Sequence, residues 1–424
     1  MSGTPWATTR AMTEALLAFN AGSSSLKFAL FCVEDGRLAP RLRGQFENLG
    51  NGARFRVHDR ARALVVDQWL DDRSADDPHA AALARLLAWI DEHDDGFDLL
   101  AAGHRVVHGG EHLTSPRRVD AALIEQMGSL AALAPLHQRH GIAPIQALHR
   151  MRPDLVQVAC FDTAFHATLP AAERTYALGA DLRATGVRRY GFHGLSYEYV
   201  AACLPEIAGA EVAHGRVIVA HLGNGASMCA MRGMRSIATT MGFTALDGLV
   251  MGTRSGALDP GAVLHLLRHE GYDAAMLEHK LYHESGLLGL SGLSHDMRTL
   301  LADGSPASRL ALDVYCHRIV REAGALAAAM GGLDAIVFTA GVGENAAPVR
   351  ARVLDALGWL GIELDPEANI RHGPRLHRSC ARVQAWVVPT NEEAVVAMHA
   401  LHLVRADARI ALPLPPDLRR AESP

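Results

Sequence analysis

The feature that most constrains the fold is a strand–turn–strand pattern that occurs twice. In residues 15–31 an apolar run ends at Asn20, a Gly- and Ser-rich turn follows, and a second apolar run continues to Phe31. Residues 217–231 repeat this plan around a Gly-Asn-Gly turn at 223–225. Apolar runs broken by such turns are typical of β-hairpins. Two hairpins of one plan, far apart in the sequence, predict two related halves.

Other segments alternate between strand and helix patterns. Residues 335–340 indicate a buried strand, residues 341–345 a glycine-rich loop, and residues 348–357 a helix with Pro348 in its first turn. The segment from Tyr315 to Met330 is apolar on one face and stops at two glycines, which predicts a helix. Strands interleaved with helices favour an α/β fold, and a length of 424 residues favours two domains.

Composition excludes several classes of protein. The net charge is −5 with mixed signs, so no nucleic-acid partner is expected. No apolar run has the length of a membrane span, and the first residues lack the apolar core of a signal peptide, so no membrane partner is expected either. The cysteines are scattered without a C-x-x-C pair, which predicts reduced thiols and a cytoplasmic location.

The first hairpin carries a candidate phosphate site. Its tip is small and rich in hydroxyl groups, and Asn20 could offer an oxygen to a hydrated metal ion. The chain is rich in arginine, yet Lys27 and Lys280 are its only lysines. A compact ammonium suits a mobile phosphoryl group better than a planar guanidinium does. The alternative is an ordinary hairpin with a Ser-rich turn.

Five further residues stand where chemistry is common, and three of them have a structural alternative. Arg105 follows a histidine, and an ion pair is its alternative role. Asp162 comes just after an apolar strand pattern, where α/β proteins place ligands, although it could simply cap a turn. Glycines flank both His193 and Arg254, which leaves these side chains accessible to an anion. Glu392 follows a strand pattern but also suits the first turn of a helix.

Together these residues supply what phosphoryl transfer requires, and their motifs resemble a known family. NAGSSSLK, HRVVHGG, PLH, FDTAFH, YGFHG, HLGNGAS, MGTRSG, SHDMR, GVGEN and PTNEE occur in this order. This series resembles the acetate/butyrate kinase family over nearly the whole chain. The resemblance implies the duplicated actin-like ATPase (ribonuclease H-like) fold, with a nucleotide cleft between two domains, and a homodimer. It also implies direct in-line, reversible transfer from ATP to acetate, giving acetyl phosphate and ADP, with Mg²⁺ as cofactor and Mn²⁺ as an alternative.

The resemblance also implies roles for individual residues. Asp162, His193 and Arg254 resemble the catalytic group, and Asn20 and Glu392 resemble the metal ligands. The substrate group comprises Arg105, His137, Val107, Leu136, Phe192 and Ala245. The nucleotide group comprises Lys27, His221, Leu222, Gly223, Asn224, Gly225, Asp296, Met297, Arg298, Gly341, Val342, Gly343, Glu344 and Asn345. The first domain is expected to span 1–162 and 394–424, and the second, nucleotide-binding domain to span 163–393.

Three departures from the family pattern bear on the acid. The family commonly has PLHNP, FTPLEG and TRSGDLDP, whereas this chain has Gln138-Arg139 after His137, Ala245 in the second motif and Ala257 in the third. The proposed catalytic residues are intact. Two alternatives therefore stay open: a propionate or butyrate kinase with a wider acid pocket, and a non-catalytic actin- or Hsp70-like nucleotide switch.

Overall fold

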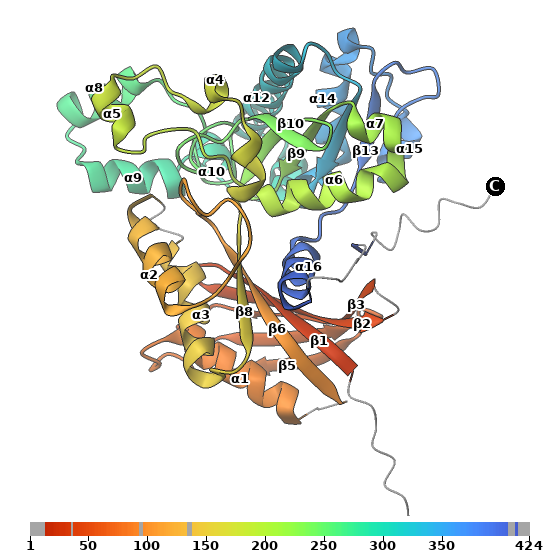
Figure 1. Cartoon of the computed structure of the whole chain (residues 1–424). Helices are drawn as coiled ribbons and strands as arrows, with labels where there is room; N and C mark the ends of the chain where they lie inside the picture. The colour runs from red at the N-terminus through yellow and green to blue at the C-terminus, as the bar shows by residue number, and fades with distance from the viewer. Residues whose placement is uncertain (1–12, 35–36, 93–95, 134–137, 406–411, 414–424) are drawn as a thin grey trace, which may run out of the picture. The chain divides into compact units, whose positions relative to one another are not determined.

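The computed structural model describes residues 13–34, 37–92, 96–133, 138–405 and 412–413, and its elements are drawn in Figure 1. The chain divides into two compact units. Unit 1 comprises Met1–Gly109, Ser115–Phe161 and Glu392–Pro413, and unit 2 comprises Gly110–Thr114, Asp162–Asn391 and Leu414–Pro424. The sequence placed these boundaries near residues 162 and 394.

Unit 1 contains a mixed sheet with eight strands among its described residues, in the order β5-β4-β3-β2-β1-β6-β8-β7. Its strands are β1 (Thr13–Ala21), β2 (Ser25–Glu34), β3 (Arg37–Glu47), β4 (Arg54–Asp59), β5 (Leu64–Trp69), β6 (Phe97–Val106), β7 (Arg117–Arg118) and β8 (Val156–Phe161). Its helices are α1 (Pro78–Glu92), α2 (Ala121–Ser129), α3 (Gln138–Met151) and α16 (Glu392–Val404), with a 3₁₀ turn at Leu130–Leu133.

Side chains of β1 point alternately to the two faces of the unit 1 sheet, and helices cover both faces. Leu17 and Phe19 join the core that α1 and α3 close, while α16 packs against β1, β6 and β8. Helix α16 lies directly on β6 because Gly103 has no side chain. A Cβ there would come within 2.4 Å of Val396 Cγ1. The start of α16 is thereby held close to the ends of β1 and β6.

Unit 2 contains a smaller sheet in the order β11-β10-β9-β12-β13. Its strands are β9 (Arg216–Leu222), β10 (Ala226–Arg232), β11 (Arg235–Thr239), β12 (Ala335–Thr339) and β13 (Gln384–Val387). Its helices are α4 (Ala171–Arg174), α5 (Ala180–Ala184), α6 (Gly194–Ala208), α7 (Ala210–His214), α8 (Pro260–His269), α9 (Ala274–His283), α10 (Gly286–Ser291), α11 (Met297–Asp303), α12 (Pro306–Met330), α13 (Ala340–Asn345), α14 (Ala347–Ala356) and α15 (Pro366–Ile370). Its 3₁₀ turns are Ala164–Thr168 and Gly358–Leu360.

The two sheets share one topology. In unit 1, β1 pairs antiparallel with β2, β2 pairs antiparallel with β3, and β1, β6 and β8 run parallel. In unit 2, β9, β10 and β11 form the same antiparallel series, and β9, β12 and β13 run parallel. Each predicted hairpin therefore provides the first two strands of its sheet. The prediction of two related halves is confirmed.

Several local predictions were incomplete or wrong. The helix expected over 315–330 is confirmed but begins earlier, at Pro306. The segment 341–345, expected to be a loop, is instead the short helix α13. Among the described residues, no helix is both long enough and apolar enough to cross a membrane.

Candidate active site

In unit 1 the candidate metal and substrate residues meet at the ends of two parallel strands. The register of β1 and β6 pairs Phe19 with His104, which brings the next residues, Asn20 and Arg105, side by side. Arg105 Nη1 donates a hydrogen bond to Asn20 Oδ1 over 3.0 Å, and Arg105 Nε lies 3.7 Å from Glu392 Oε2. Both charged side chains are largely buried, which strengthens their attraction.

Lys27 lies next to this group. It is an exposed residue of β2 whose register partner across the hairpin is Asn20. Residues directly opposite in an antiparallel pair project from the same face of the sheet. The Lys27 ammonium and the Asn20 amide therefore share one face, beside the turn formed by Gly22, Ser23 and Ser24.

The unit 1 group suits a hard divalent cation. Asn20 and Glu392 each direct an oxygen at the same guanidinium, so an amide oxygen and a carboxylate lie near each other. No group of three or more His, Cys, Asp or Glu side chains that could hold a metal occurs among the described residues. Mg²⁺ typically takes one or two protein oxygens and completes its shell with water and substrate phosphates. The donor set fits this ion.

In unit 2, His193 and Arg254 converge on the turn of the second hairpin. A Cβ on Gly225 would lie 3.4 Å from His193 Nε2 and 3.8 Å from Arg254 Nη1, so both groups flank bare backbone. Arg254 Nη1 also donates to the carbonyl of Ala245 over 3.2 Å. The guanidinium lies over the Tyr282 ring, 5.8 Å from its centroid. The imidazole and the guanidinium thus both lie close to the backbone of Gly225.

The backbone around His193 explains the glycines on either side of it. His193 is the N-cap of α6 and adopts a left-handed conformation with φ of 59°. The next residue, Gly194, donates its N–H to the carbonyl of Asp162 over 2.9 Å. A Cβ on Gly194 would lie 2.1 Å from that oxygen, so only glycine fits there. This contact fixes the His193 loop against Asp162, whose side chain is buried.

The predicted phosphate-loop residue His221 also joins the His193 group. The imidazole rings of His193 and His221 are stacked, with centroids 4.1 Å apart and planes 19° apart. His221 Nδ1 lies 2.8 Å from Ser196 Oγ. Because His221 is the second-last residue of β9 and His193 is the N-cap of α6, this stack joins the sheet to that helix.

The turn residue Asn224 is bound to the loop that carries Arg254. Gly252 N donates to the Asn224 carbonyl over 3.0 Å. A Cβ on Gly252 would lie 2.2 Å from Asn224 Oδ1, so any side chain there would displace the Asn224 amide. Leu222 ends β9 and pairs with Ala226, and Gly223 N donates to the Gly225 carbonyl over 3.1 Å.

Helix α13 contains the predicted nucleotide residues Gly341, Val342, Gly343, Glu344 and Asn345. Glu344 Oε1 accepts hydrogen bonds from Ala340 N at 2.8 Å and from Thr390 N at 3.1 Å. Burial raises the pKa of Glu344, and these two N–H groups oppose that rise. Glu344 therefore ties α13 to the segment after β13.

The predicted adenosine-side residues begin helix α11. Asp296 is its N-cap and accepts from Arg298 N over 2.9 Å, while Met297 is buried. The side-chain hydrogen bond from Arg298 and that backbone bond lower the pKa of Asp296 to about 2. The Arg298 side chain is 90% exposed, so this ion pair lies at the surface.

The structure distributes the predicted acid-pocket residues over both units. Val107 is buried in unit 1, whereas Phe192 and Ala245 belong to unit 2. Leu136 and His137 lie outside the described residues. The described residues of the predicted pocket therefore do not all belong to one unit.

Sequence reasoning missed the residue that supports Phe192. His166 Nε2 lies 2.9 Å from the Phe192 carbonyl, and its Nδ1 lies 2.8 Å from Ser236 Oγ. Burial lowers the pKa of His166 to about 4, so this histidine is neutral at pH 7. It belongs to the FDTAFH motif, but nothing in the sequence distinguishes a supporting histidine from a catalytic one.

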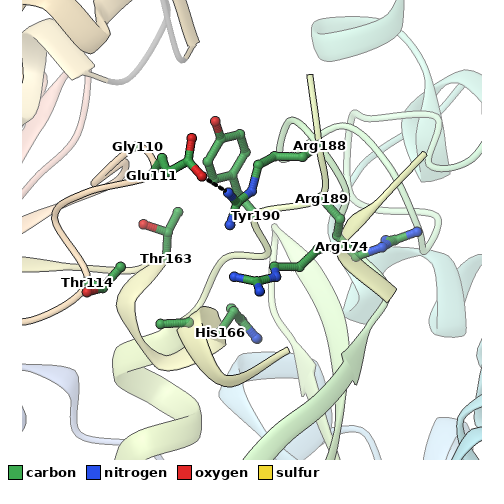
Figure 2. A pocket seen from close by; sticks show the side chains of 10 residues that line it. Gly110, Glu111, Thr114, Thr163, His166, Arg174, Arg188, Arg189 and Tyr190 are labelled. Atoms are coloured by element: carbon green, nitrogen blue, oxygen red, sulfur yellow. Dashed lines mark hydrogen bonds and ion pairs between the residues drawn. The ribbon is translucent and has the colours of Figure 1, made fainter. Parts of the chain in front are cut away.

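Unit 2 also contains a small cavity that the sequence did not predict, with a volume of about 80 Å³. It is lined by Gly110, Glu111, Thr114, Thr163, His166, Ala167, Arg174, Arg188, Arg189 and Tyr190 (Figure 2). Arg188 pairs with Glu111, as the dashed line in Figure 2 marks. Arg189 has carboxylates of Glu173 and Asp247 within 3.7 Å. Carboxylates thus neutralise the positive charges of Arg188 and Arg189.

Comparison with known proteins decides the family. The family model described as "Acetokinase family" matches residues 15–398. The chain belongs to the acetokinase family. The acetate kinase of Rhodopseudomonas palustris (strain TIE-1) is 50% identical over 396 residues, covering 92% of this chain and 99% of the relative.

Solved structures of acetokinase-family enzymes share the fold. A propionate kinase from Francisella tularensis subsp. tularensis SCHU S4 superposes with a TM-score of 0.85 at 34% identity, covering 92% of this chain and 99% of that one. A Porphyromonas gingivalis acetate kinase gives a TM-score of 0.83 at 34% identity, covering 92% and 100%. The fold is thus the duplicated actin-like ATPase fold, and the protein is a phosphotransferase with a carboxyl group as acceptor. The comparisons support this kinase interpretation over a non-catalytic nucleotide switch.

Proposed function

We propose that this acetokinase-family protein transfers the γ-phosphoryl group of ATP to acetate, reversibly, giving acetyl phosphate and ADP. The observation that supports this most directly is the convergence of His193 Nε2 and Arg254 Nη1 on Gly225. Two donors beside bare backbone suit the equatorial oxygens of a transferring phosphoryl group. The acetate kinases among the relatives agree with acetate as the acceptor.

The reaction is a direct in-line displacement. An acetate oxygen forms a bond to the γ-phosphorus while the bond from that phosphorus to the oxygen of the β-phosphate breaks. Acetate is already ionised near neutral pH, so no general base is required. The difficulty is to bring two anions together. Arg105 binds the carboxylate, and Arg254 and His193 bind the phosphoryl oxygens, where losing one donor typically costs ~2.7–4 kcal/mol of transition-state stabilisation.

Asn20 and Glu392 are the proposed ligands of Mg²⁺, with Mn²⁺ as an alternative. When bound, the ion would neutralise charge on the nucleotide's phosphates. Arg105 already contacts both of these ligands, so it links the metal ligands to the carboxylate. We assign Asp162 an orienting role toward an arginine or the metal's water shell, because the reaction needs no base.

The nucleotide is proposed to contact the three segments of unit 2 described above. The turn 221–225 and helix α13 lie at the phosphates and ribose, and residues 296–298 lie beside the adenosine. Lys27 contacts the terminal phosphate from β2.

Acetate is the proposed preferred acid, with propionate second. Ala245 replaces a proline of the family pattern, which frees a little space beside Arg254. Burying one more methylene is worth ~0.8 kcal/mol at most, which is a few-fold change in kcat/KM. Phe192 still limits the pocket, so butyrate should be poor. A hydroxamate assay with ATP and the three acids tests this order. Butyrate equal to or better than acetate would refute the assignment.

We also propose a homodimer and a cytoplasmic location. Helix α8 has no buried residue, and Leu264 and Leu267 on it are exposed, as is Met276 on the neighbouring α9. A second copy would cover such apolar side chains. Leu264→Asp should then convert a dimer to a monomer in light scattering, whereas a monomeric wild type would exclude it. Six free thiols, five of them buried, are compatible with a reducing compartment.

A further inference from the structure

A buried hydroxyl group lies within hydrogen-bond distance of the His193 ring. Its Nδ1 lies 2.8 Å from Ser227 Oγ on strand β10. Ser227 is fully buried, and β10 follows directly on the turn that contains Gly225. One ring nitrogen of His193 therefore faces Ser227 while the other, Nε2, lies beside Gly225 and Arg254.

A tyrosine contacts the same serine. Tyr197 lies one turn after His193 on α6, and its hydroxyl forms a hydrogen bond with Ser227 Oγ. Tyr197 is also fully buried. The three side chains form a row from Tyr197 through Ser227 to His193.

The chemistry of the two hydroxyl groups favours one direction of hydrogen bonding along this row. A phenol is more acidic than an aliphatic alcohol, so it is the better donor and the poorer acceptor. Tyr197 therefore donates to Ser227. Among the described residues, the Ser227 hydroxyl has only Tyr197 Oη and His193 Nδ1 as partners. Its own proton is thus directed to Nδ1, which must be unprotonated to accept it.

We propose that Ser227 and Tyr197 are positioning residues that hold His193 as the neutral tautomer with its proton on Nε2. This proposal deepens, and rests on, the role given to His193 in phosphoryl transfer. The Nε2–H group then points to the place where negative charge develops on the phosphoryl oxygens. No proton has to be transferred during the reaction, because His193 acts only as a hydrogen-bond donor.

The alternative is a reversed row. An Nδ1–H of His193 would donate to Ser227, and Ser227 would donate to Tyr197. Nε2 would then carry no proton in the neutral form, and His193 could offer a hydrogen bond to phosphate only as an imidazolium. The two directions differ in which nitrogen is protonated, so they can be told apart.

Nitrogen NMR tests the direction without using activity. The protein is labelled with [¹⁵N]histidine, and the His193 signals are identified by their loss in His193→Gln. The proposal predicts a pyridine-type Nδ1 and a pyrrole-type Nε2 at pH 7 in the wild-type protein without substrates. A pyrrole-type Nδ1, or two protonated nitrogens, would overturn it. This readout stands even if the enzyme proved inactive on acetate, so the failures of the two proposals are distinguishable.

Kinetics test the consequence. Ser227→Ala should lower kcat roughly tenfold through misorientation of the ring, with KM for ATP and acetate little changed. Ser227→Thr keeps the hydroxyl and should restore most of the rate, whereas a loss caused by packing alone would not be rescued. Tyr197→Phe should lower kcat a few-fold and let a pyrrole-type Nδ1 signal appear.

Tyr199→Phe is the matched control for Tyr197→Phe. Tyr199 is another buried tyrosine of the same helix, and it lies outside the row. Its loss of a hydroxyl should leave kcat and the His193 signals unchanged. Equal kinetic effects of the two phenylalanine variants would overturn the positioning role of Tyr197.

Discussion

Arg350 gives the sharpest test of how the structure supports nucleotide binding. It is fully buried, and its pKa is lowered to about 10 by that burial. Its Nη1 donates to the carbonyls of Gly343 at 2.9 Å and Glu344 at 2.8 Å. Its other nitrogens contact Asn369 and His372. None of these partners is a carboxylate, so Arg350 acts by fixing backbone carbonyls of α13.

Arg350→Met should therefore destabilise unit 2 and weaken ATP binding. Methionine fills much of the volume but leaves the carbonyls of Gly343, Glu344 and Asn369 without their donor. Each buried acceptor without a donor costs ~1 kcal/mol or more, so the free energy of unfolding should fall by roughly 3–5 kcal/mol. Such a loss is a large fraction of ordinary domain stability, about 5–15 kcal/mol. Misplaced carbonyls in α13 should raise KM for ATP roughly fivefold, which corresponds to ~1 kcal/mol.

Thermal unfolding by circular dichroism and initial rates at varied ATP and acetate measure both effects. Arg352→Met is the control, because Arg352 lies on the same helix but is half exposed and pairs with Asp313. Arg352→Met should shift the melting temperature by no more than a few degrees and should leave KM for ATP unchanged. The reasoning is refuted if Arg350→Met melts like the wild type, or if KM for acetate rises as much as KM for ATP.

Three further predictions follow from the described contacts. Arg254→Ala and His193→Ala should lower kcat at least a hundredfold with little change in nucleotide affinity, consistent with the loss of ~2.7–4 kcal/mol per donor; near-normal turnover in either would disprove its role. Lys27→Arg should impair turnover because a planar guanidinium misplaces the terminal phosphate, and full activity would make Lys27 an incidental hairpin residue. Burial raises the pKa of Asp72, but hydrogen bonds from three backbone N–H groups of residues 50–53 outweigh it and hold that pKa below its ordinary value. The ionised Asp72 therefore stabilises the folded state fully at neutral pH, and this contribution is lost as the pH falls through the lowered pKa. Asp72→Ala should accordingly lower the melting temperature at pH 7 and much less in acid, whereas an equal loss at both would contradict this.

The sequence predicted those parts of the fold that depend on local pattern. Apolar runs broken by Gly-, Ser- and Asn-containing turns were enough to predict the hairpins at 15–31 and 217–231. The two glycines after Met330 were enough to predict where α12 ends. The glycines around His193 indicated a tight backbone turn, and the structure has one: His193 is left-handed, and a Cβ on Gly194 would collide with the Asp162 carbonyl. The catalytic role of His193 stays a prediction.

The missed parts depend on contacts between distant segments. Helix α13 contains two glycines and an asparagine, which are poor helix formers, and its ends are held by Glu344 and by Arg350. Ser227 and Tyr197 are ordinary residues in the sequence, and only the packing of α6 on the sheet brings them to His193. Glu392 lies in the first turn of α16, as its structural interpretation predicted, and it also pairs with Arg105. Its role as a metal ligand stays a prediction.

Phosphorus NMR with isotopically labelled acetate tests the central claim most directly. The purified protein is incubated with ATP, Mg²⁺ and [¹⁸O₂]acetate, and the spectrum is followed with time. Direct attack by the carboxylate predicts an acyl phosphate resonance displaced by one ¹⁸O atom bonded to phosphorus, growing in step with ADP and absent without acetate. An acyl phosphate without that displacement, or ADP and inorganic phosphate formed regardless of acetate, would contradict the account.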